Sequence, residues 1–104
     1  RTQEMKPFTL TRSALADLRS IAMFTEGRWG REQRNVYLKQ FDDAFHMLAD
    51  SPALGVPCDE IMPGYRKFSQ GSHVIFFKSA TKGVIEIIRV LHQSMDVETQ
   101  FHGV

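Results

Sequence analysis

The chain has 104 residues, of which 42% are hydrophobic and 24% are charged, and thirteen Lys and Arg stand against twelve Asp and Glu. This length and balance fit one folded domain with one core and exclude an intrinsically disordered chain, so we expect residues 1–104 to form a single domain. A formal net charge of +1 also excludes the strong positive field of proteins that bind nucleic acids or anionic lipid, and no sequence-specific binding to nucleic acid is expected.

Cellular location is constrained by the cysteine count and by hydropathy. Cys58 is the single cysteine, so no intrachain disulfide can form, which fits a reducing cytoplasm. No run approaches the about 18 apolar residues of a membrane span, and the polar residues 1–6 lack the apolar core of a signal peptide. Residues 1–4 precede the first methionine, Met5, and are either an upstream extension or residues added to the protein.

A short strand and a helix are predicted at the start of the chain. Residues 7–11 should form the strand, because Phe8 and Leu10 alternate with threonines. Ser13 is expected to cap the following helix. A shared buried face is expected for the residues that recur every three or four positions, namely Leu18, Ala22, Thr25 and Trp29. Trp29 is therefore predicted to be a core residue that closes the pair of helices, and the alternative is an exposed contact residue at the turn between Gly27 and Gly30.

A second helix is predicted over residues 32–50. Gly27 and Gly30 should let the chain turn between the two helices. Helical spacing is shown by five apolar positions, namely Tyr37, Phe41, Ala44, Phe45 and Leu48. Pro52 ends the helix, because proline disfavours the α conformation in the residue before it. The two helices should form an antiparallel hairpin.

The second half of the chain predicts an antiparallel sheet. Residues 52–64 are rich in Pro and Gly and should form a loop without regular structure. Three apolar runs follow at 65–69, 73–78 and 84–91, separated at hairpin distances, and they predict a three-stranded meander. The expected fold class is thus α+β, with the helical hairpin on one sheet face. Because two of the runs are almost continuously apolar, the tail, residues 93–104, or a partner segment should cover part of the other face.

No metal or cofactor is predicted. Asp42 and His46 lie one helical turn apart, yet no third ligand is evident nearby, so a solvated surface pair is the better interpretation.

Basic side chains on or beside the meander are the main candidates for function, and they are Arg66, Lys67, His73, Arg89 and His92. Strand alternation sends Arg66 and Lys67 to opposite faces, and likewise Arg89 and His92, so only a subset can converge. Two interpretations are open: a partner-binding role, or rim cations paired with Glu86, Asp59 or Glu60, which contribute about 0–1 kcal/mol each.

Four sequence blocks resemble the ParE toxins of the RelE/ParE superfamily. They are GRWG at 27–30, PGYRKF at 63–68, GSHVIFF at 71–77 and IRVLHQSMDV at 88–97. Their order and spacing make the resemblance specific, and the family fold is also a helical hairpin on an antiparallel sheet.

The resemblance implies a toxin that is neutralised by a ParD-type antitoxin and that inhibits DNA gyrase, with no catalytic residue and no cofactor. An antitoxin segment is expected to fold against the sheet and against a rim that carries Tyr65, Phe68 and Met95. The candidate contact residues for antitoxin or target are Tyr65, Arg66, Lys67, Phe68, His73, Arg89, His92 and Met95.

The alternative is a ribosome-dependent mRNA endoribonuclease of the RelE type, which would use His73, Arg66 and His92. The resemblance to this branch is weaker. RelE nucleases carry an Arg where this chain has His73, another Arg near Gln93, and a Tyr in the tail, and the cation expected two residues after Arg66 is replaced by Phe68. These departures favour the ParE branch.

Overall fold

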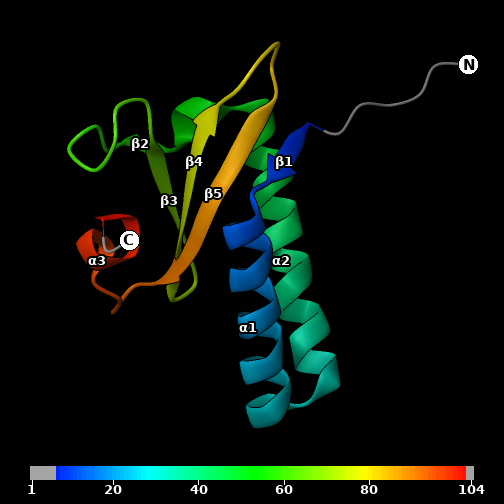
Figure 1. The fold of residues 1–104 in the computed structure, drawn as a ribbon. Coiled ribbons are helices and arrows are strands. Elements are labelled where there is room, and N and C mark those ends of the chain that lie inside the picture. Colours follow the sequence, from blue (N-terminus) through cyan, green and yellow to red (C-terminus); the bar gives the residue numbers. More distant parts are fainter. Residues whose placement is uncertain (1–6, 103–104) are drawn as a thin grey trace, which may run out of the picture.

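The computed structural model describes residues 7–102. Its elements in chain order are β1 (Phe8–Leu10), α1 (Arg12–Trp29), α2 (Arg31–Asp50), the 3-10 turn η1 (Pro52–Leu54), β2 (Val56–Pro57), β3 (Arg66–Gln70), β4 (His73–Ser79), β5 (Ile85–His92) and α3 (Val97–His102). The sheet has the order β1-β5-β4-β3-β2, with β1 parallel to β5 and the other neighbours antiparallel. The hairpin α1–α2 lies on one face and α3 on the other (Figure 1), which confirms the predicted α+β architecture and the meander.

The hydrophobic core between the hairpin and the sheet contains the apolar stripe of α2. Phe41, Phe45 and Leu48 are almost completely buried, and they pack with Ile75, Phe77, Ile85 and Ile87 of the sheet. Tyr37 is half-buried at one end of this stripe. The helical spacing of residues 32–50 therefore predicted the main core correctly.

The start of α1 differs from the prediction. Thr11, not Ser13, is the N-cap, and its side-chain oxygen accepts a hydrogen bond from the backbone N–H of Ala14 at 2.9 Å. The Thr11 hydroxyl also donates to the carbonyl of Ile88 at 2.8 Å. Thr11 is the better cap because it joins the helix start to β5 as well.

The end of α1 also corrects the prediction. Gly27 is helical, α1 continues to Trp29, and only Gly30, with φ +97°, breaks the helix. Trp29 is 64% exposed and its neighbour Phe24 67% exposed, so the assignment of Trp29 to the core is wrong. The reason is geometric: the hairpin projects beyond the end of the sheet (Figure 1), so its last turns have no strand beneath them.

The second face of the sheet carries a smaller core. Cys58, Phe76 and Leu91 are buried there, and Val97 and Phe101 of the tail pack against them. The Phe101 ring lies 5.1 Å from the ring of Phe76, measured between centroids. The sequence predicted that either the tail or a partner segment covers this face, and in the structure the tail covers it.

The loop at residues 52–64 is more regular than predicted. It contains η1 and β2, and β2 pairs with β3 at the edge of the sheet. Gly55 lies between these two elements and is buried. A Cβ there would stand 2.4 Å from the ring of Phe77, so glycine is required for the close approach.

The edge of β5 beyond β1 is closed by side chains of α1. Asp17 Oδ2 accepts a hydrogen bond from the backbone N–H of Val90 at 2.9 Å. Both Asp17 oxygens also accept from the Arg89 guanidinium, Nε at 2.8 Å and Nη2 at 2.9 Å. Arg89 in turn reaches the Gln100 carbonyl of α3 at 3.4 Å. One carboxylate therefore connects α1, β5 and, through Arg89, α3.

We predict that Asp17→Ala destabilises the fold by about 2–3 kcal/mol. The substitution leaves the largely buried Arg89 guanidinium and the Val90 backbone N–H without their hydrogen-bond acceptor. Urea denaturation measures the change. Asp43→Ala is the matched control and should change stability far less, since the Asp43 pair with Lys39 is exposed. Equal effects of the two substitutions would contradict the role given to Asp17.

We predict that Phe101→Ala destabilises the fold by about 1–2 kcal/mol and increases binding of a hydrophobic dye, because α3 no longer covers the second core. Denaturation and dye fluorescence measure the two effects. Val36→Ala, at an exposed position of α2, is the control. Unchanged stability and dye binding in Phe101→Ala would show that α3 does not cover this face in solution.

Candidate functional site

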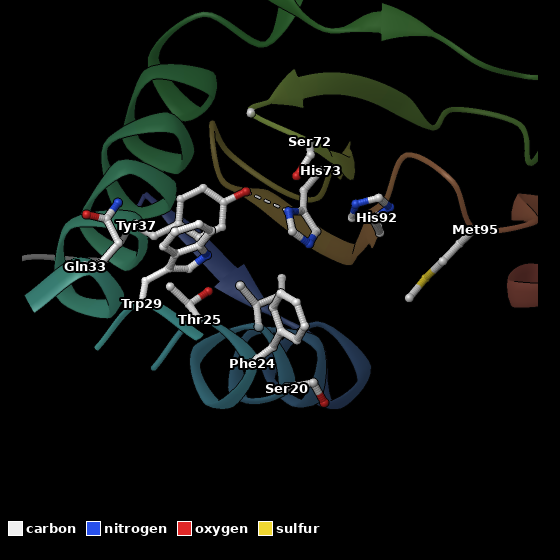
Figure 2. Close-up of a pocket in the computed structure, with 12 residues that line it drawn as sticks. Ser20, Phe24, Thr25, Trp29, Gln33, Tyr37, Ser72, His73, His92 and Met95 are labelled. Carbon is white, nitrogen blue, oxygen red and sulfur yellow. Dashed lines mark hydrogen bonds between the residues drawn. The ribbon is translucent and has the colours of Figure 1, made fainter. Parts of the chain in front are cut away.

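A groove of about 800 Å³ opens between the projecting end of the helical hairpin and the ends of β4 and β5. Figure 2 shows the side chains that line it, with the helical aromatic residues on one side and Met95 on the other. Its lining is Ser20, Ile21, Phe24, Thr25, Trp29, Gln33, Tyr37, Gly71, Ser72, His73, His92 and Met95. We call this feature the groove.

The walls of the groove are apolar and exposed. Phe24, Trp29 and Met95 are 67%, 64% and 46% exposed. Among the residues that the structure describes, the lining includes no Asp, Glu, Lys or Arg. Arg28 lies beside this wall, with its guanidinium carbon 5.5 Å from the centre of the Trp29 ring. Within residues 7–102 the groove therefore offers aromatic surface with a positive charge beside Trp29 and no negative charge in its lining.

A β-bulge in β5 places two histidines in the groove. Phe77 pairs with Ile87 while Phe76 pairs with Arg89, so Ile88 is the extra residue. The bulge reverses the alternation of side chains beyond it. As a result His92, which pairs directly with His73, faces the hairpin, and Arg89 faces away from it.

The two imidazoles are held by neighbours on both sides. The Tyr37 hydroxyl and His73 Nδ1 are 2.7 Å apart, the contact drawn in Figure 2. The His73 and His92 rings are perpendicular, with centroids 5.3 Å apart. His92 Nδ1 lies 2.7 Å from the Ser94 hydroxyl and accepts from the Ser94 backbone N–H at 3.1 Å. Both rings are thus oriented before any ligand arrives.

Burial lowers the pKa of His73, and the adjacent His92 lowers it further. Asp17 opposes this with a smaller effect that raises the pKa. His73 is therefore neutral at neutral pH and resists protonation.

Arg89 does not have the partners that the sequence suggested. It pairs with Asp17 rather than with Glu86, Asp59 or Glu60. This hydrogen bond raises the pKa of Arg89 above its ordinary value. The Arg89 guanidinium is thus bound by groups of the chain itself, namely the Asp17 carboxylate and the Gln100 carbonyl.

The other predicted contact residues are spread over both faces of the sheet. Arg66 donates to the Gly55 carbonyl at 2.6 Å, and Phe68 packs against the main core. Tyr65 packs against the second core, and Lys67 pairs with Phe76 on that side. Only His73, His92 and Met95 of the predicted set meet in the groove.

Sequence reasoning missed the helical wall of the groove. Helical spacing does not single out Phe24, and it places Trp29 in the core. Tyr37 packs against the core as predicted but also lines the groove. The pairing of Asp17 with Arg89 was not predicted either. The position of the two aromatic residues of α1 in the sequence could have indicated exposure. Phe24 and Trp29 lie in the last two turns before Gly30, and the end of a helix can extend beyond the sheet on which it packs.

The proposed surface pair on α2 forms as its spacing predicts. His46 Nδ1 lies 2.8 Å from the Asp42 carbonyl oxygen and 3.6 Å from its carboxylate. Within residues 7–102 no three His, Cys, Asp or Glu side chains come together as metal ligands would.

Comparison with known proteins identifies the class of protein that carries this fold and groove. Residues 8–97 match the family described as "ParE toxin of type II toxin-antitoxin system, parDE". The chain belongs to the ParE toxin family and is a ParE-type toxin of a type II toxin-antitoxin system.

Individual relatives agree. The chain is 44% identical over 91 residues to a toxin ParE1 of Mycobacterium tuberculosis, covering 88% of this chain and 93% of the relative. It is 44% identical over 92 residues to toxin ParE1 of Caulobacter vibrioides, covering 88% and 94%. A solved structure described as "Chromosomal ParDE TA system from P. aeruginosa" has the same fold, with a TM-score of 0.69, 21% identity and coverage of 82% of this chain and 92% of that one.

The helices are unsuited to crossing a membrane. Among those of residues 7–102, none combines the length and the apolar character that spanning a bilayer requires.

The lowered pKa of His73 predicts a specific pH dependence of stability. Below about pH 6.5 the unfolded chain protonates this imidazole while the folded protein resists it, so acidification should destabilise the native state. His73→Gln removes this contribution. Urea denaturation at pH 7.5 and pH 5.5 should show a smaller loss of stability in the variant than in the parent, and an equal loss would contradict the prediction.

Proposed function

We propose that this toxin is a non-enzymatic, cytoplasmic inhibitor of DNA gyrase that a ParD-type antitoxin neutralises. Membership of the ParE family supports the toxin role. The similar structure from P. aeruginosa is that of a chromosomal ParDE toxin-antitoxin system, which supports a partner of the ParD type.

The observation that carries the non-enzymatic part is the engagement of the arginines. RNA cleavage needs an acid and a base at the scissile phosphate and cations on its oxygens. Arg89 is bound by Asp17, and Arg66 donates to the Gly55 carbonyl. Neither guanidinium is directed at the histidine pair.

Distance along the sheet separates Arg66 from the histidines. Gln70 pairs with His73, whereas Arg66 pairs with Phe77, four residues further along the strand. At about 3.3 Å per residue this is about 13 Å. The alternative endoribonuclease, which needs His73, Arg66 and His92 at one phosphate, is therefore disfavoured, although the two imidazoles do lie together.

Inhibition of gyrase is tested by a supercoiling assay with purified enzyme, ATP and relaxed plasmid. We expect the folded chain to stop supercoiling and to accumulate cleaved DNA attached to gyrase, because a poison that traps an intermediate blocks replication at low copy number. Pre-incubation with the antitoxin should restore supercoiling.

The endoribonuclease is tested in parallel on translating ribosomes, where mRNA should stay intact. Unchanged supercoiling at a large excess of folded toxin would reject the gyrase proposal. Cuts in mRNA that disappear in His92→Ala would establish the endoribonuclease in its place.

A further inference from the structure

The groove carries large apolar side chains that are exposed to solvent. Phe24 and Trp29 are each about two-thirds exposed, and Met95 is nearly half exposed. All three line one concave surface (Figure 2). Contiguous exposed apolar side chains of this kind are typical of interaction sites.

The backbone around the groove limits how a partner can bind. The strand ends that border it pair with each other, His73 with His92, and the Ser72 carbonyl accepts from the Gln93 N–H. In the described part of the chain no free strand edge faces the groove there, so a partner cannot extend the sheet at this point. Side chains must make the contact, which favours an amphipathic helix lying in the groove.

The polar part of the groove is the histidine pair. Each Nδ1 is already occupied, by Tyr37 in one ring and by Ser94 in the other. The Ser94 backbone N–H can only donate, so neutral His92 carries its proton on Nε2. When Tyr37 donates to His73 Nδ1, the proton of His73 is on Nε2 as well. A hydrogen-bond acceptor bound in the groove favours the tautomer with the proton on Nε2. The protonated, charged imidazole also carries a proton on Nε2.

Charge complementarity gives the chemistry of the occupant. The groove lining contains no carboxylate, and Arg28 stacks on its Trp29 wall. The carboxylate whose charge reaches His73 is Asp17, and Asp17 is already bound to Arg89 and Val90. An acidic side chain entering the groove therefore meets two N–H donors and little repulsion.

We infer that His73 and His92 form a carboxylate-binding subsite, which takes an Asp or Glu side chain of an amphipathic antitoxin helix. The apolar side chains of that helix pack on Phe24, Trp29 and Met95. The inference rests on the proposed function, because it assumes that an antitoxin is the partner.

Proton uptake is the signature of this subsite. A carboxylate stabilises the charged imidazole, so binding should take up protons near about pH 6.5 and tighten as the pH falls. The groups that face the pair are Asp17 from α1, Tyr37 from α2 and Ser94 after β5, and Arg28 lies on the far wall.

The experiment is isothermal titration of the toxin with the full-length antitoxin encoded by the adjacent gene, at pH 6.5 and pH 8.0. Two buffers of different ionisation enthalpy give the number of protons taken up. The variants are His73→Gln and His92→Gln, with His46→Gln as the matched control, since His46 is an exposed histidine of α2 outside the groove.

We expect tighter binding and proton uptake at pH 6.5 in the parent and in His46→Gln. Each groove variant should bind about tenfold more weakly at pH 6.5 and take up fewer protons, with a smaller loss at pH 8.0. Parent-like affinity and proton uptake in both groove variants would overturn the subsite while leaving the antitoxin role intact. A parent toxin that does not bind the antitoxin would overturn the proposed neutralisation as well.

The apolar wall is tested with Trp29→Ala. Because Trp29 is 64% exposed, its loss should leave the melting temperature almost unchanged and weaken antitoxin binding by about tenfold or more. Sedimentation of the toxin alone gives its oligomeric state. A dimer that Trp29→Ala dissociates would assign the groove to a second copy of this chain and overturn the inference.

Discussion

The Asp17 carboxylate is the interaction on which the rest of the structure depends. It occupies the open edge of β5 beyond the short β1, where it accepts from the Val90 N–H and from the Arg89 guanidinium. A strand edge that would otherwise be free is thereby closed by a helix side chain. The contact holds α1 beside β5, and the last turns of α1 project beyond the sheet (Figure 1).

Function follows from the same constraint. Asp17 holds the Arg89 guanidinium in an ion pair, which supports the proposal that the toxin acts without catalysis. The projecting end of α1 leaves Phe24 and Trp29 without a strand beneath them, and the bulge at Ile88 turns His92 toward them. A fold that could place cations around a scissile bond instead presents an aromatic groove with two oriented imidazoles, which is suited to protein recognition.

Periodicity predicted most of the fold, because burial imposes a regular spacing on helices and strands. The two helices, the meander and the core stripe of α2 were all readable in this way. Spacing failed at Trp29, since a helical period shows which face a residue lies on but not whether a sheet extends beneath it. The salt bridge between Asp17 and Arg89 joins residues that are 72 positions apart, and no local pattern predicts it. Of the residues that line the groove, the sequence singled out His73, His92 and Met95, while the aromatic wall needed the three-dimensional structure.

Stoichiometry distinguishes an inhibitor that acts by contact from a catalyst. The measurement is supercoiling activity at several fixed gyrase concentrations, each titrated with toxin and followed over time. If the toxin inhibits by contact, the toxin concentration needed for half-inhibition should reach a constant value as incubation is extended. That concentration should not fall far below one toxin per gyrase. Inhibition that keeps growing with time at one toxin per many gyrase molecules would contradict it.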